Sequence, residues 1–133
     1  MKIKLISIHT TLFSLLFALS SATLAEIKLE DNSKLIGSWF LESVAPTLDR
    51  KKIPENRVWE FREDGKMTSS GFNRIIGKET TQEMPYRIEN GKIFSDVPGR
   101  PGKFDTYEVY EMKGDSMILK KGGKAGYYFF KKK

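Results

Sequence analysis

The sequence contains no cysteine, and its only histidine, His9, lies within the first 25 residues. The rest of the chain therefore lacks the groups used in Ser-His-Asp and Cys-His nucleophilic catalysis and in the common zinc and copper sites. Its acidic side chains, such as Glu60, Glu63 and Asp64, are scattered over turns and outward strand positions, where a solvated surface is their simplest interpretation. These absences predict a protein that is not an enzyme and that holds no metal or other cofactor.

Long apolar runs are also missing, except at the N-terminus. Lys2 and Lys4 precede the run "LISIHTTLFSLLFAL", and "SSATLA" follows it, an order typical of a secretory signal peptide that is cut after residue 25. The alternative is a membrane anchor, but the run is shorter than the roughly 20 apolar residues that a bilayer requires. We expect residues 1–25 to be removed, leaving residues 26–133 as one domain without a transmembrane anchor. A small exported domain without disulfides is typical of a bacterial periplasmic or secreted protein.

The charge balance is basic but moderate. Removal of the two lysines in residues 1–25 lowers the basic count from 23 to 21 against 17 acids, which gives 21 − 17 = +4. The basic residues gather in "DRKK" (49–52), at Lys120, Lys121 and Lys124, and at the C-terminus. Export makes nucleic acid an unsuitable partner, so the charge favours anionic lipid headgroups, cell-wall polymer, an acidic partner or a solvated surface.

Turn signals divide the chain into hairpins. Asp64-Gly65, Asn90-Gly91 and Gly114-Asp115 supply residues suited to tight hairpin turns, and each lies between runs of alternating apolar residues. The pattern predicts eight strands, at residues 36–44, 56–63, 66–73, 81–89, 92–97, 104–112, 115–121 and 126–132. A short helical turn is expected at residues 31–37, with little other helix. The predicted fold is all-β, an eight-stranded antiparallel up-and-down β-barrel, which hides the strand edges by closing.

The start of the first predicted strand carries a family likeness. Gly37-Ser38-Trp39 resembles the Gly-x-Trp signature of the lipocalin and calycin superfamily, and "VWEFREDGKM" resembles the following hairpin of small bacterial lipocalin-like domains. The resemblance implies that Gly37 bends the chain onto the barrel floor and that Trp39 closes this end beneath a basic residue of the last strand. We assign that basic role to Lys131. The chain is shorter than a full lipocalin and shows no long helix after the last strand.

The predicted inner face of the barrel has two interpretations. An eight-stranded barrel is just wide enough to be filled by side chains or to hold one small ligand. In the second case, the inward aromatic residues would bind a small apolar or amphipathic molecule at the mouth formed by loops 45–55 and 98–103. The candidate ligand-binding residues are Phe61, Phe72, Tyr86, Tyr107, Tyr127 and Phe129.

The predicted outer face offers a second hypothesis. If Trp39 points inward, Phe40 points outward, and the same alternation places Tyr128 and Phe130 outside on the last strand. Because the first and last strands of a closed barrel are neighbours, these three would form one exposed aromatic patch, which is typical of a protein partner or a homodimer. The alternative is that the N-terminal segment of the domain covers the patch.

Overall fold

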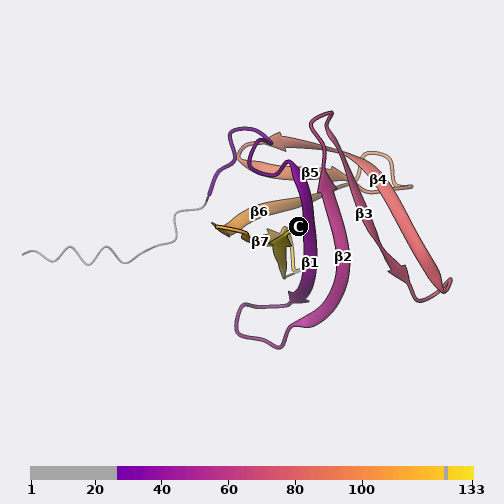
Figure 1. Cartoon of the computed structure of the whole chain (residues 1–133). Helices are drawn as coiled ribbons and strands as arrows, with labels where there is room; N and C mark the ends of the chain where they lie inside the picture. The colour runs from indigo at the N-terminus through magenta and orange to yellow at the C-terminus, as the bar shows by residue number, and fades with distance from the viewer. Residues whose placement is uncertain (1–26, 125) are drawn as a thin grey trace, which may run out of the picture.

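The computed structural model describes residues 27–124 and 126–133, which form a closed barrel of eight antiparallel strands (Figure 1). The strands are β1 (Gly37–Ala45), β2 (Ile53–Phe61), β3 (Lys66–Asn73), β4 (Lys78–Glu89), β5 (Lys92–Asp96), β6 (Phe104–Lys113), β7 (Ser116–Lys121) and β8 (Tyr127–Lys132). Each strand pairs with the next, and β8 returns to pair with β1. The predicted eight-stranded up-and-down barrel is confirmed.

The up-and-down order gives the barrel two distinct ends. The tight turns at 62–65, 90–91 and 114–115 lie at the end where β1 begins, here called the closed end. The connections at 46–52, 74–77 and 97–103, and residues 122–124 and 126, lie at the opposite end, here called the open end. Both loops that were predicted to form a mouth are therefore at the open end.

The segment before β1 packs across the closed end. Leu29 and Leu35 are buried, and the Leu29 amide donates a hydrogen bond to the Gly91 carbonyl (3.1 Å). The residues predicted as a helical turn form a single turn in which the Asn32 carbonyl accepts hydrogen bonds from the amides of Leu35 (2.9 Å) and Ile36 (3.2 Å). No helix is present among residues 27–124 and 126–133.

Side chains from all eight strands fill the barrel from its closed end up to the level of Trp59 and Tyr107. The buried core residues on the strands are Trp39, Leu41, Trp59, Phe61, Met67, Met84, Tyr86, Ile93, Tyr107, Val109, Met117, Leu119 and Phe130. Full burial of a side chain such as Phe61 stabilises a fold by about 1.5–3 kcal/mol. The closed half is thus a packed core that holds the barrel together without disulfides.

The face of β8 that points into the barrel is the opposite of the one predicted. Phe130 pairs with Leu41 and with Met117, and it is only 2% exposed. Tyr128 pairs with Leu119 and packs against the core. The prediction that Tyr128 and Phe130 point outward is therefore wrong. Four successive aromatic residues, "YYFF", make both faces of the strand apolar, so alternation could not identify the inner one.

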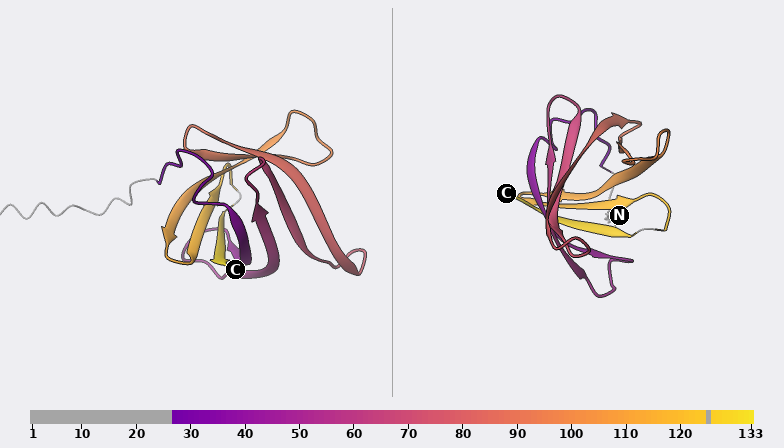
Figure 2. Two further views of the ribbon diagram at one scale, coloured as in Figure 1. Left: turned by 45° about the horizontal axis from the view of Figure 1, so that its top comes forward. Right: turned by 90° about the vertical axis from the view of Figure 1, so that its right-hand side faces the viewer.

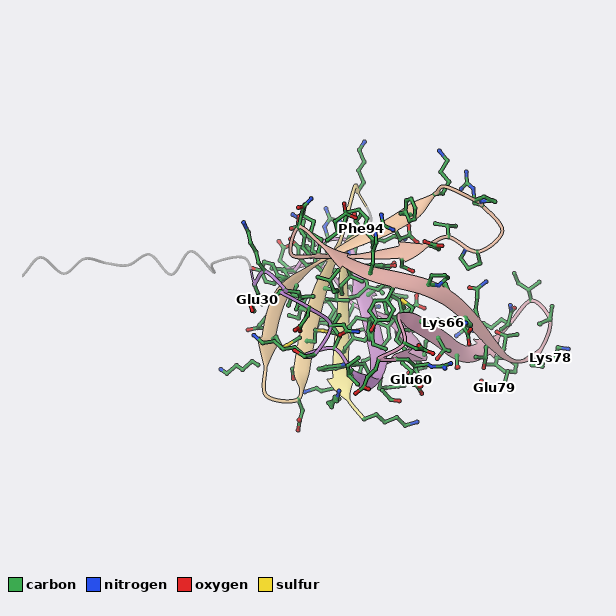
Figure 3. All side chains as sticks on the ribbon, turned by 90° about the horizontal axis from the view of Figure 1, so that it is seen from above. Glu30, Glu60, Lys66, Lys78, Glu79 and Phe94 are labelled. Atoms are coloured by element: carbon green, nitrogen blue, oxygen red, sulfur yellow. The ribbon has the colours of Figure 1, made fainter. Side chains whose placement is uncertain are left out.

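The β3–β4 hairpin extends beyond the barrel (Figure 2). The β2–β3 pairing ends at Val58 and Ser70, and the β4–β5 pairing begins only at Tyr86. Residues 71–73 and 78–85 therefore pair only with residues of the same hairpin. Figure 3 shows Lys78 and Glu79 at its far end, well away from Lys66.

The predicted signal peptide, residues 1–25, lies outside the described residues, so its removal stays a prediction. Within the part of the chain that the structure describes, no helix has the length and apolar content needed to cross a bilayer.

Candidate functional site

Trp39 shuts the core at the closed end of the barrel. It is 2% exposed, and its indole Nε1 donates a hydrogen bond to the Leu35 carbonyl (2.9 Å). The cation above the ring is Lys132, whose Nζ lies 4.5 Å from the ring centroid and donates to the Ile36 carbonyl (2.7 Å). Lys131, which was assigned this role, instead points outward and donates to Ser116 Oγ (3.1 Å). The reason is the same reversal of the inner face of β8.

Gly37 permits this arrangement in two ways. Its φ of +117° is in the region that favours glycine. A Cβ atom at this position would also lie 2.8 Å from Lys132 Nζ, too close for the lysine to cross to the Ile36 carbonyl. The closed end is therefore a structural site, shut by side chains and by the N-terminal segment.

Nearer the open end, three aromatic residues form a layer across the barrel. The Trp59 ring centroid is 5.4 Å from that of Tyr107 and 5.9 Å from that of Tyr128, and the two tyrosine rings are 5.7 Å apart. Burial raises the pKa of the Tyr107 hydroxyl, with smaller contributions from Tyr128 and Asp105. The neutral phenol is thus the form held in this layer.

Beyond this layer several inward positions are polar. Arg57 pairs with the inward Leu41, and its Nε donates to Ser69 Oγ (3.1 Å) across β2 and β3. Gly71 leaves room for this side chain, because a Cβ there would lie 3.0 Å from Arg57 Cγ. Arg57 is half-buried, and its guanidinium is held against the β3 wall by Ser69.

Two further charged side chains, of opposite sign, lie on other strands toward the open end. Asp105 is paired with the buried Ser95, and Lys121 is paired with Tyr107, which places both on inward positions of β6 and β7. Lys121 Nζ is 3.5 Å from Asp105 Oδ1. The open end therefore has an aromatic floor with a rim of charged and hydroxyl groups, here called the mouth site and defined by Arg57, Ser69, Ser95, Asp105 and Lys121 above Trp59, Tyr107 and Tyr128.

Comparison with known proteins supports the architecture. No family model and no curated protein sequence matches the chain. Two solved structures match in fold. One is a lipocalin-like protein from Bacteroides uniformis (TM-score 0.59, 18% identity, 74% of this chain and 98% of that one), and the other is an uncharacterized protein from Bacteroides eggerthii (TM-score 0.58, 15% identity, with the same coverage). The fold is lipocalin-like.

Within this lipocalin-like barrel, the predicted ligand-binding residues do not lie together. Tyr107 alone belongs to the mouth site. Phe61 and Tyr86 point inward but belong to the closed half, where the Tyr86 hydroxyl donates to the Arg62 carbonyl (2.7 Å) and accepts from Asn32 Nδ2 (3.0 Å). The hydrogen bonds tie Tyr86 to the barrel floor, so it has a structural position.

The other three predicted ligand-binding residues lie on the outside of the lipocalin-like barrel, so their assignment to the inner face is wrong. Phe72 is exposed on the projecting hairpin, because Gly71 rather than Phe72 occupies the inward position of β3. Tyr127 packs edge-on against Tyr110 (5.3 Å between centroids), and Phe129 lies beneath Lys52 Nζ (4.1 Å). Both are outward because Tyr128 and Phe130 are inward.

The predicted outer patch does not exist in the expected form. Phe40 is half-buried on the outer face of β1, but Tyr128 and Phe130 lie on the inner side. The outer face instead has a groove of about 220 Å³ lined by residues of β1, β6, β7 and β8. Phe129, Ile118 and Lys131 are among its lining residues.

Sequence reasoning missed the charged residues of the mouth site, although the signal was present. Residues two apart on a strand point to the same face. Arg57 is two and four residues before Trp59 and Phe61, Lys121 is two after Leu119, and Asp105 is two before Tyr107. Extension of the inner-face alternation by one position toward the open end would have found all three. Residues 27–124 and 126–133 hold no cluster of three or more Asp, Glu, His or Cys side chains suited to a metal ion.

Proposed function

We propose that this protein is an exported, non-enzymatic binding protein whose mouth site holds a small amphipathic anion. The observation that carries the proposal is the change along the inner face, from a packed apolar core to a rim of charged and hydroxyl groups directly above an aromatic layer. Pockets that bind small molecules combine apolar and aromatic walls with a few placed polar groups.

The charges of the rim favour an anionic head group. Lys121 has Asp105 beside it, whereas Arg57 is hydrogen-bonded to the neutral Ser69. Arg57 therefore has unused donors in a partly desolvated setting, and guanidinium binds carboxylate or phosphate through two parallel hydrogen bonds. The aromatic rings of Trp59, Tyr107 and Tyr128 supply the apolar contact for the rest of the ligand.

Fluorescence titration tests this proposal, because Trp59 forms part of the floor. We expect decanoate to cause a saturable change in tryptophan emission and decanol, which has the same chain and no charge, to bind at least about tenfold more weakly. Trp59→Phe should remove the signal, since the other tryptophan, Trp39, is buried at the closed end. Equal binding of the two probes, or no binding of either, would contradict the proposal.

A matched pair of arginine variants separates a specific from a general charge effect. Arg57→Gln should abolish the preference for decanoate over decanol. Arg62→Gln removes an arginine that is exposed at the closed end, where it pairs with Asp64 (2.6 Å), and it should leave the preference unchanged. Loss of the preference in both variants would show that net charge, not the mouth site, is responsible.

A protein-interaction role is the second candidate, and the outer groove beside Phe129 is the feature that favours it. Under this alternative, a homodimer or partner complex forms across β1, β7 and β8. Sedimentation of the protein alone and of Phe129→Ser would detect a dimer and its loss. A monomer at all concentrations would remove the homodimer form of this candidate.

A further inference from the structure

The exposed apolar side chains gather at one end of the barrel. The large hydrophobic residues exposed in the described part of the chain are Leu48, Ile53, Phe72, Ile75, Ile76 and Phe104. All six lie in open-end connections or in the strand ends beside them. Isolated exposed hydrophobic residues are ordinary, but a set confined to one end of a small domain is typical of an interaction surface.

The most exposed of these side chains lie at the tip of the projecting β3–β4 hairpin. Ile75 is 94% exposed, and Ile76 and Phe72 are each more than half exposed. The turn that presents them is well defined, since Asn73 Oδ1 accepts a hydrogen bond from the Ile75 amide (2.9 Å) and the Asn73 carbonyl accepts one from Gly77 (2.8 Å). The tip therefore holds two isoleucines outward at the part of the hairpin that has no neighbouring strand.

Two cations lie at this tip, followed by Glu79, and further basic residues occur in the other open-end loops. Arg74 and Lys78 flank the isoleucines, and among the described residues neither forms an ion pair. The four open-end connections (46–52, 74–77, 97–103, and 122–124 with 126) contain seven Lys or Arg and one Asp, which gives 7 − 1 = +6. The C-terminal lysines lie at the closed end, so charge alone would not orient the molecule. The apolar residues would, because they occur at the open end.

We propose that the protein docks on anionic lipid bilayers through the β3–β4 hairpin, with Ile75 and Ile76 inserted at the headgroup boundary and Arg74 and Lys78 bound to lipid phosphates. The tip projects from the barrel, and a cation lies on either side of its two isoleucines, which suits insertion between headgroups. Apolar side chains and basic residues add to each other in such binding. This inference goes beyond the mouth site and does not depend on it.

Vesicle sedimentation tests the docking. The wild-type protein should bind vesicles of phosphatidylcholine mixed with phosphatidylglycerol, bind phosphatidylcholine vesicles weakly, and be released by salt. Ile75→Ser/Ile76→Ser should lower the partition coefficient at least about tenfold, which corresponds to about 1.4 kcal/mol. Arg74→Gln/Lys78→Gln should lower it by about fivefold per charge, in proportion to the phosphatidylglycerol content. Absence of binding to mixed vesicles, or undiminished binding by both variants, would overturn the proposal.

Matched variants at the closed end control for net charge and position. Lys113→Gln/Lys133→Gln removes two exposed lysines there and should leave binding within about twofold of wild type. A tryptophan introduced as a reporter, Ile75→Trp, should emit at shorter wavelength when vesicles are bound and should be quenched by brominated lipids. Glu63→Trp at the closed end should show neither change. Both native tryptophans are buried, so they contribute a constant background. An unquenched Ile75→Trp would overturn the proposal.

The two proposals fail separately. Decanoate titration is done without vesicles, and the hairpin variants should bind decanoate as the wild type does. Arg57→Gln should bind vesicles as wild type does, because Arg57 lies inside the barrel against Ser69. If Arg57→Gln abolished vesicle binding while Ile75→Ser/Ile76→Ser did not, the mouth rather than the hairpin would be the contact with lipid, and the docking proposal would be wrong.

Discussion

Lys132, which covers Trp39, should be among the partly exposed residues that contribute most to the free energy of unfolding. Lys132→Met keeps much of the aliphatic stem but removes the ammonium, its hydrogen bond to the Ile36 carbonyl (2.7 Å) and its position 4.5 Å from the Trp39 ring centroid. A hydrogen bond to a charged group contributes about 1.5–3 kcal/mol, and a partly exposed cation–π contact about 0.5–1 kcal/mol. Since Lys132 is only half-buried, we take the lower part of these ranges and expect a loss of about 2–3 kcal/mol.

Urea and thermal unfolding monitored by tryptophan fluorescence would measure this loss. For a domain of about 100 residues it corresponds to a decrease in Tm of about 8–12 °C. Lys131→Met is the matched control, because it changes the adjacent residue, whose hydrogen bond to Ser116 is exposed, and should cost less than about 0.5 kcal/mol. Equal destabilisation by the two variants would refute the assignment of Lys132 to the closed end.

Three further predictions follow from burial, titration and processing. Phe130→Ala should cost about 3–5 kcal/mol because it empties a core site, whereas Phe129→Ala on the outer face should cost about 1 kcal/mol or less; thermal unfolding would show the reverse order if β8 faced the other way. Burial holds the pKa of Tyr107 above its ordinary value of 10.0 in the folded state, so the free energy of unfolding should be unaffected by this group below about pH 10 and should fall as the pH rises further. Tyr107→Phe should weaken that alkaline decrease, and an identical pH profile would contradict it. N-terminal sequencing of the exported protein should find Glu26 first, and a retained Met1 would disprove processing.

Turn chemistry and alternation were sufficient to predict the barrel. Asn90 and Gly91 both adopt positive φ (52° and 76°), which is the conformation that made Asn-Gly a hairpin signal. Between such turns, one apolar and one polar face define each strand, so the inward positions of Trp59 and Met117 could be read from local sequence alone. Closure then follows, because each strand in an up-and-down order needs a partner on both sides.

Only the tertiary structure decided which face of β8 is buried and which lysine covers Trp39. The strand is aromatic at four successive positions, so its inner face is set by its register against neighbours rather than by its own pattern. Phe130 is inward because it pairs with Leu41 and Met117, which leaves Lys132 two residues later above Trp39. A one-residue difference in register exchanges the two faces of a whole strand.

Local sequence and tertiary structure together determine the mouth site. The sequence already placed Arg57, Asp105 and Lys121 at inward parity on three strands, but they are separated by up to 64 positions along the chain (121 − 57 = 64). Only closure of the barrel brings β2, β6 and β7 to a common rim above Trp59, Tyr107 and Tyr128. Local sequence determines which way a strand side chain points, whereas pairing between distant strands determines what it meets there.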